Sequence, residues 1–166
     1  RQRRMAGEAG YTAIQTREAD VAVQVRRMSP KYGDIIIDVG GRDTASQRAA
    51  LAVADRLLIP FSPTSVDLWT ADTVVVLLKE ARTFNPHLNA YAIINKAFSR
   101  GSDNAEAAAI LQEYPDYWMY LETLIGNRKA FSNAFGSGQA VMEYQPKDTK
   151  AMKEMRALHR HLFDTK

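Results

Sequence analysis

Cysteine is absent from the 166 residues of this chain. Without a thiol, the chain has no disulfide, no thiolate zinc site, no cysteine-ligated iron–sulfur cluster and no cysteine nucleophile. No apolar run approaches the roughly 18 residues that a membrane-spanning helix requires, so we expect no membrane among its partners. With 46% hydrophobic and 25% charged residues, the composition is typical of a globular protein, and we expect one domain over residues 1–166.

The net charge is only +3, but the charge is distributed unevenly along the chain. Residues 1–28 carry six basic and three acidic side chains, and residues 147–166 carry the same numbers. Residues 29–146 carry ten basic and thirteen acidic side chains. Basic ends around a mildly acidic centre are compatible with an anionic partner, but salt screening makes this a weak argument by itself.

Short apolar runs alternate with longer amphipathic runs along the chain. We predict strands over residues 10–15, 34–38, 56–61, 89–94 and 117–125. We predict helices over residues 20–28, 44–54, 67–84, 102–114, 128–135 and 147–163. Because residues 34–38 (DIIID) are β-branched and do not alternate, we expect a strand buried on both faces. The alternation of strands and helices predicts an α/β fold with a mainly parallel, twisted sheet flanked by helices.

The large aromatic residues are expected mainly in the core. We assign Trp69, Trp118, Phe131 and Phe135 to it, since aromatic side chains at helical or strand positions are usually packed inside. The three histidines do not show the i,i+4 spacing of a helical zinc pair, so none is assigned to a metal.

Polar and small residues follow the predicted strand 34–38, at the edge where ligands bind in an open parallel sheet. Asp38 can hold a hydrated magnesium ion, which prefers oxygen ligands and keeps several waters. Gly40 and Gly41 allow a backbone N–H to approach a terminal phosphate. An aspartate at a strand end followed by a glycine turn explains the same residues, and the residues alone do not decide between the two readings.

The segment 32–67 (YGDIIIDVGGRDTASQRAALAVADRLLIPFSPTSVD) resembles the ParA type of partition ATPase, in the deviant-Walker group that also contains the MinD-like proteins. The resemblance continues at Ile93-Ile94-Asn95-Lys96. It continues further in residues 125–134 (IGNRKAFSNA), which are similar to the family's I-x-x-R…F-x-x-A helix. Gly138 and Val141 stand where the family has G-x-x-V. The resemblance extends over the chain from about Gly10 and implies a P-loop NTPase-like fold.

The family resemblance also implies a function. ParA-like proteins use ATP and magnesium to partition plasmid or chromosomal DNA, and they dimerise when ATP is bound. Their partners are non-specific DNA and a centromere-binding protein. The resemblance therefore implies a cytoplasmic, nucleoid-associated protein. By resemblance, Asp38 is the catalytic and water-mediated magnesium residue, Gly40 and Gly41 contact the terminal phosphate, and Asn95 contacts adenine.

Basic residues near the C-terminus are candidates for DNA contact. Helix residues such as these can neutralise DNA phosphates without reading the base sequence, although the same pattern fits a solvated helix face. The resemblance to DNA-binding partition ATPases favours DNA. The candidates are Arg128, Lys129, Lys150 and Lys153.

One departure from the family is large: the 166 residues contain no G-K-[ST] phosphate-binding loop. We therefore expect the chain to lack the family's N-terminal P-loop unit and to show no measurable ATP hydrolysis, whereas an intact parent is expected to be an ATPase. Two alternatives remain. The chain could be a non-catalytic interaction module on the same scaffold, or another ATP-dependent enzyme of the wider group, such as a ligase of dethiobiotin-synthetase type.

Overall fold

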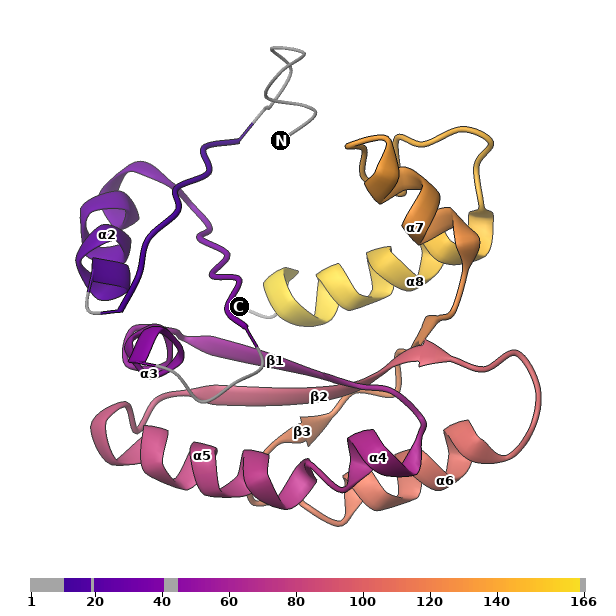
Figure 1. Ribbon diagram of the computed structural model, residues 1–166, viewed down its shortest axis with the longest axis horizontal. Coiled ribbons are helices and arrows are strands. Elements are labelled where there is room, and N and C mark those ends of the chain that lie inside the picture. Colours follow the sequence, from indigo (N-terminus) through magenta and orange to yellow (C-terminus); the bar gives the residue numbers. More distant parts are fainter. Residues whose placement is uncertain (1–10, 19, 41–44, 165–166) are drawn as a thin grey trace. The chain divides into compact units, whose positions relative to one another are not determined.

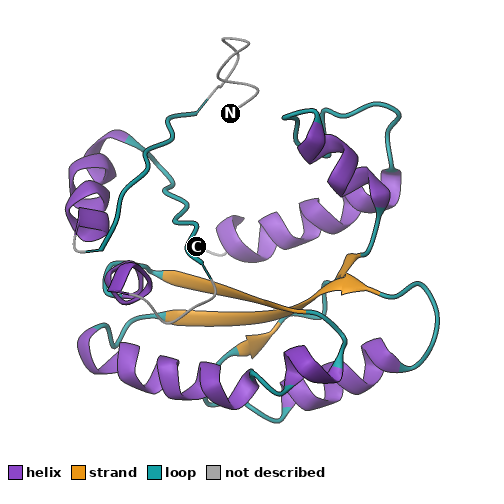
Figure 2. Ribbon diagram, in the orientation of Figure 1, coloured by secondary structure: helices purple, strands orange, loops and turns teal. Residues whose placement is uncertain are grey.

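The computed structural model describes residues 11–18, 20–40 and 45–164. The described residues divide into two compact units. Unit 1 contains residues 58–71 and 91–164, together with 11 and 12. Unit 2 contains the described residues within 13–57, together with 72–90. Figure 1 labels the helices and strands, and Figure 2 separates them from the loops.

The sheet is parallel and is built around β2 (Asn89–Ala97). The strand order is β1 (Arg56–Phe61), β2, β3 (Met119–Tyr120). The fourth strand, β4 (Ile125–Gly126), pairs with β2 outside this path. Strand β3 pairs with the start of β2, at Tyr91 and Ala92, and β4 pairs with its end, at Asn95 and Ala97. The α/β fold class predicted from the sequence is confirmed.

In unit 1, helices pack on both faces of these strands (Figure 1). On one face, Ile93, Leu121 and Ile125 are buried with Leu158 of α8 (Thr149–His159), and Leu162 of the π-helical turn η2 (Arg160–Asp164) packs against them. On the other face lie α4 (Ser65–Leu68) and α6 (Asp103–Gln112). Alternate residues of β2 thus serve opposite faces, as strand geometry requires.

A second apolar cluster of unit 1 joins α7 (Lys129–Gly136) to the start of α8. Its buried members are Ala134, Val141 and Ala151, with Tyr144 packed against them. Asp148 caps α8, since its carboxylate accepts hydrogen bonds from the backbone N–H groups of Lys150 and Ala151, both at 3.0 Å. The cap satisfies N–H groups that have no partner within the helix.

Unit 2 contains α2 (Asp20–Met28), the 3₁₀ turn η1 (Ser29–Lys31), α3 (Ala45–Leu51) and most of α5 (Ala71–Phe84). An ion pair between Arg48 and Glu80 links α3 to α5. The side-chain amide of Asn85 donates to the carbonyls of Leu51 and Ala54, both at 2.8 Å. Asn85 therefore satisfies carbonyl groups that the end of α3 leaves free.

The strand predicted over residues 34–38 does not form. The chain from 34 to 40 has no strand or helix structure, and Ile36 is 82% exposed, so it is not buried on both faces (Figure 2). The physical reason is the lack of a partner: none of the strands in the described part of the chain pairs with this segment. An apolar run becomes a buried strand only when its backbone groups are hydrogen-bonded and its faces are covered.

Two other predicted strands also differ. Residues 11–15 have no regular structure, and Gly10 lies outside the described residues. The predicted strand 117–125 is reduced to β3 and β4, because the chain bends at Glu122 and leaves β2 between them. In contrast, the strand over 56–61 is confirmed at both ends, and β2 runs three residues past the predicted strand 89–94.

The helices predicted over 20–28, 102–114, 128–135 and 147–163 are confirmed, with ends shifted by a few residues. The helix predicted over 44–54 forms only as α3, and Thr44 lies outside the described residues. The helix predicted over 67–84 is broken between α4 and α5. At the break, the backbone N–H and the hydroxyl of Thr70 both donate to the carbonyl of Asp67, at 3.0 and 2.6 Å.

Two of the aromatic residues assigned to the core are exposed. Trp118 is buried, its indole N–H donates to the carbonyl of Leu111 at 2.8 Å, and its ring lies 5.8 Å from that of Phe61. Phe131 is half-buried in the apolar clusters. In contrast, Trp69 is 76% exposed and Phe135 is 86% exposed. Trp69 follows α4, at the break before α5, and Phe135 points away from the buried side of α7, which Ala134 occupies.

Candidate functional site

The predicted adenine-contacting residue Asn95 lies near the carboxyl end of β2, in unit 1. The pairing register between β2 and β4 shifts between Asn95 and Ala97, so that Lys96 is the extra residue of a bulge. Lys96 has φ +54°, a left-handed conformation that is rare for a residue with a side chain. Such a bulge redirects the chain at the strand end, and bulges of this kind are common next to active sites.

Asn95 is half-buried, and its side-chain oxygen accepts a hydrogen bond from the N–H of Lys96 at 2.9 Å. Its amide nitrogen carries two N–H donors. Neither donor has a hydrogen-bond partner among the residues that the structure describes. The arrangement therefore fixes the side-chain oxygen and leaves donor groups available to a ligand.

The loops that follow β1 and β2 are held by side-chain hydrogen bonds. After β1, the Asp67 carboxylate accepts from the backbone N–H of Ser62 at 3.1 Å. After β2, the Asn104 side chain bonds both backbone groups of Phe98: it accepts from the N–H at 3.0 Å and donates to the carbonyl at 2.7 Å. These contacts give two neighbouring strand ends fixed geometries. The sequence pattern gave no signal for Asn104.

At the end of β4, the carboxylate of Glu154 on α8 accepts hydrogen bonds from Gly126 and Arg128. The Gly126 N–H lies 3.1 Å from it, and two nitrogens of the Arg128 guanidinium lie within 2.5 to 3.1 Å. A Cβ at Gly126 would come within 3.1 Å of the Arg128 side chain, so a larger residue there would require a small shift of the guanidinium. The hydrogen bond to Glu154 raises the pKa of Arg128 above its ordinary value, although burial opposes this.

The ion pair changes the interpretation of Arg128. The side chains of Arg128 and Glu154 are only 29% and 16% exposed, so the guanidinium is engaged in an internal contact. Glu154 was not among the residues singled out from the sequence, because the two partners are 26 positions apart and no local pattern joins them. The other three candidates for DNA contact, Lys129, Lys150 and Lys153, are exposed on α7 and α8.

The predicted magnesium and phosphate residues lie in a different part of the molecule. Asp38 and Gly40 are exposed and belong to unit 2, whereas Asn95 belongs to unit 1, and Gly41 lies outside the described residues. Within the described ranges, no group of three or more histidine, aspartate or glutamate side chains gathers that could hold a metal ion. A single carboxylate remains compatible with magnesium, which is often bound through one or two carboxylates, water and substrate phosphates.

No known protein-family model matches the chain. In sequence, it is 21% identical over 149 residues to the maintenance of carboxysome distribution protein A of Halothiobacillus neapolitanus (strain ATCC 23641 / c2). The alignment covers 89% of this chain and 68% of that relative.

Two solved structures share the fold. Apo McdA from Cyanthece superimposes with a TM-score of 0.67 at 18% identity, over 83% of this chain and 57% of McdA. The cell division ATPase MinD of Pyrococcus furiosus superimposes with a TM-score of 0.68 at 18% identity, over 97% of this chain and 74% of MinD. The chain thus spans less than two thirds of the McdA structure.

In its α/β fold, the chain is similar to the solved structures of McdA and MinD. With the sequence relative, they confirm the resemblance to ParA- and MinD-type ATPases. In the part of the chain that the structure describes, no helix has both the length and the apolar character needed to cross a membrane.

Proposed function

We propose that the chain is a ParA-like component of an ATP-dependent positioning system that partitions plasmid or chromosomal DNA. The observation that carries the proposal is the Asn95 turn, since it presents amide donors at the carboxyl end of a central parallel strand. Ligands of open α/β sheets bind at that edge. The likeness to McdA and MinD supports a nucleotide as the ligand.

In this proposal, the nucleotide is ATP or ADP with magnesium. Asn95 contacts the adenine base, and Asp38 holds magnesium through water. Gly40 and Gly41 approach the terminal phosphate through backbone N–H groups. The chemistry of these residues fits the ligand, because amides donate to ring nitrogens, carboxylates suit magnesium, and glycine allows close approach of the backbone.

The proposed partners are non-specific DNA, a centromere-bound protein and a second copy of the chain in the ATP-bound state. The exposed Lys129, Lys150 and Lys153 contact DNA phosphates, and Arg128 holds α8 against the end of β4 through Glu154. We further propose that the protein acts on the nucleoid, in the cytoplasm, and that both units belong to one NTPase domain.

The nucleotide assignment is tested by titrating the chain with magnesium-ATP and recording backbone amide NMR shifts. One or two hydrogen bonds contribute about 0.5–1.5 kcal/mol each, whereas a millimolar complex needs about 4 kcal/mol. We therefore expect binding in the millimolar range or weaker and no phosphate release. The shifts should centre on Asn95 and Gly126 and should be smaller with GTP.

The matched variants are Asn95→Ala, which should abolish these shifts, and Asn89→Ala, which removes an exposed asparagine at the other end of β2 and should preserve them. Equal responses to ATP and GTP, or shifts that survive in Asn95→Ala, would contradict the adenine contact. Micromolar affinity would show that the nucleotide site has been misplaced.

DNA contact is tested with a labelled duplex at increasing salt. Each phosphate contact adds about 0.9 to the slope of log K against log salt. Replacing Lys129, Lys150 and Lys153 by glutamine should therefore reduce the slope by up to about 2.7. Lys31→Gln, at an exposed position of unit 2, is the control. An unchanged slope in the triple variant would exclude these lysines as the DNA contacts.

A further inference from the structure

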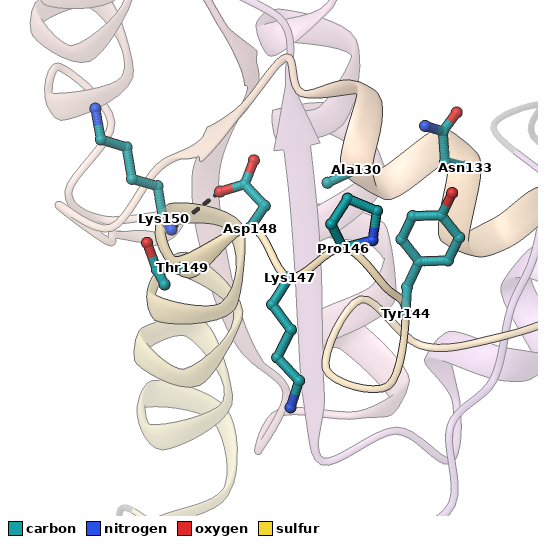
Figure 3. A pocket seen from close by; sticks show the side chains of 8 residues that line it. All are labelled: Ala130, Asn133, Tyr144, Pro146, Lys147, Asp148, Thr149 and Lys150. Atoms are coloured by element: carbon teal, nitrogen blue, oxygen red, sulfur yellow. Dashed lines mark hydrogen bonds between the residues drawn. The ribbon is translucent and has the colours of Figure 1, made fainter.

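A pocket of 440 Å³ lies between α7 and the segment that leads into α8, within unit 1 (Figure 3). Its lining includes Ala130, Asn133, Tyr144, Pro146, Lys147 and Lys150. The volume lies within the range of about 300–1,000 Å³ that is usual for small-ligand sites. None of these residues belongs to the Asn95 turn, so the pocket needs a separate explanation.

The walls of the pocket are held in place by the core beneath them. Tyr144 and Ala130 pack on the cluster of Ala134, Val141 and Ala151. The start of α8 is fixed by the Asp148 cap. Tyr144 and Pro146 both line the pocket (Figure 3), so its wall includes an aromatic ring and an apolar ring. Such a wall suits a planar ring.

The polar groups of the lining are mostly donors, and the charge is positive. Two lysines stand against one aspartate, and the Asp148 carboxylate is already engaged in two hydrogen bonds to backbone N–H groups. Asn133, Thr149 and Tyr144 add an amide and two hydroxyls. An anionic ligand with a flat ring fits this combination, and a nucleotide has both features.

The two lysines decide what kind of nucleotide fits. Figure 3 shows the side chains of Lys147 and Lys150 extending in different directions, so they do not converge on one phosphate. They can contact phosphates on either side of one nucleotide in a strand. Bases inside a duplex are stacked and cannot enter a pocket without being flipped out. Proteins that bind single strands combine cationic side chains with aromatic rings on which bases stack.

We propose that this pocket binds one nucleotide of single-stranded nucleic acid, with its base against Tyr144 and its flanking phosphates at Lys147 and Lys150. This contact goes beyond the proposed duplex binding and needs neither ATP nor the Asn95 turn. Single-strand binding is therefore a second activity of the same C-terminal region. It depends on Tyr144, which the proposed duplex contact does not use.

The test is fluorescence anisotropy of the full chain with labelled (dT)12, with a duplex of the same length, and with free dTMP as competitor. Loss of a stacked ring weakens binding substantially, so Tyr144→Leu should weaken (dT)12 binding about ten- to hundredfold. Tyr144→Phe keeps the aromatic ring and should weaken (dT)12 binding less than Tyr144→Leu does. Lys147→Gln with Lys150→Gln should reduce the salt slope for (dT)12 by about 1.4, at about 0.7 per phosphate. Lys31→Gln, which removes one positive charge at an exposed position of unit 2, is the control.

Duplex affinity should not change in Tyr144→Leu, which separates this proposal from the duplex-binding proposal. Unchanged (dT)12 affinity in a folded Tyr144→Leu variant would overturn the pocket, as would an equal loss for the duplex. If millimolar dTMP displaced (dT)12 completely, the pocket would be a site for free nucleotides, and the proposal that it binds single-stranded nucleic acid would be overturned. If Tyr144→Leu fails to fold, Asn133→Asp places a negative charge at the exposed rim. An unchanged (dT)12 affinity in that variant would also overturn the proposal.

Discussion

Residues 34–38 and strand β2 each contain consecutive isoleucines, yet these isoleucines end in opposite environments. Ile93 and Ile94 of β2 are 2% and 1% exposed, whereas Ile36 is 82% exposed. Strand β2 has β1, β3 and β4 as neighbours, and helices of unit 1 cover it. The 34–38 segment has no paired strand in the described part of the chain.

The difference shows that hydrophobicity favours burial of an apolar run but does not determine whether that run joins the sheet. A strand also needs partners for its N–H and C=O groups, because such groups are costly to bury unpaired. Leaving apolar side chains in water costs less per residue than burying several unpaired backbone groups. Pairing therefore decides which of two similar runs enters the sheet.

The sharpest test of this comparison is the same substitution in both runs. Ile93→Ala should lower the free energy of unfolding by about 2–5 kcal/mol, since it leaves a cavity in the cluster with Leu121, Ile125 and Leu158. Ile36→Ala removes an exposed side chain and should change the free energy of unfolding by less than about 0.5 kcal/mol. Urea unfolding followed by circular dichroism measures both. Similar losses in the two variants would mean that the 34–38 segment is packed after all.

The second test loosens the end of β4, which pairs with β2. Glu154→Ala leaves the Arg128 guanidinium and the Gly126 N–H without their acceptor in a partly buried setting. We expect a loss of about 1–3 kcal/mol. Glu113→Ala, at the exposed end of α6, is the control and should be within about 0.5 kcal/mol of the parent. If the two variants are equally stable, the ion pair does not fasten β4.

The third test relieves the bulge at the end of β2. A left-handed residue with a side chain costs about 1–2 kcal/mol, and glycine adds about 0.5–1 kcal/mol of entropy to the unfolded chain. Lys96→Gly should therefore stabilise the protein by about 0.5–1 kcal/mol, measured as a higher urea midpoint. Lys96→Ala retains the Cβ and should give no gain. A destabilised Lys96→Gly variant would contradict the assigned backbone strain.

The smallest effect concerns Tyr120 of β3. Burial, and then the charge of Glu122, raise the pKa of Tyr120 above its ordinary value near 10. The folded state therefore holds the phenolic proton more tightly than the unfolded state does. That contribution is fully present below pH 10 and is lost as the pH rises above it. Tyr120→Phe should lose less stability than the parent between pH 9 and 11 in urea titrations. Parallel curves would show that Tyr120 does not couple to folding.

The sequence predicted the elements whose signals are local. Residues 56–61 (RLLIPF), followed by Ser62-Pro63, gave a strand with both ends correct, because turn residues bound the apolar run. The predicted helix over 20–28 was also correct, since Ser29-Pro30 ends it. The break between α4 and α5, before Ala71, was missed. The outcome for 34–38 depends on strand pairing, which a local pattern does not contain.

The candidate site shows the same division. The strand predicted over residues 89–94 located most of β2, but the bulge at Lys96 arises from the register with β4, about 30 positions later. Arg128 was predicted from the sequence as a DNA contact, and its ion-pair partner Glu154 on α8 was not anticipated. Long-range ion pairs and registers are set by tertiary packing, so a pattern of neighbouring residues cannot specify them.

The hydrogen bonds of Asn85 bear on the order in which the chain can fold as it leaves the ribosome. The carbonyl groups of Leu51 and Ala54 accept hydrogen bonds from the side-chain amide of Asn85, which is synthesised 34 and 31 residues after them. Unit 2 is also discontinuous, since residues 58–71 of unit 1 are translated between its two parts. Contacts of such sequence separation slow folding, because closing the intervening loop costs entropy before the contacts form. The end of α3 therefore gains these two hydrogen bonds only after α5 and Asn85 have been synthesised.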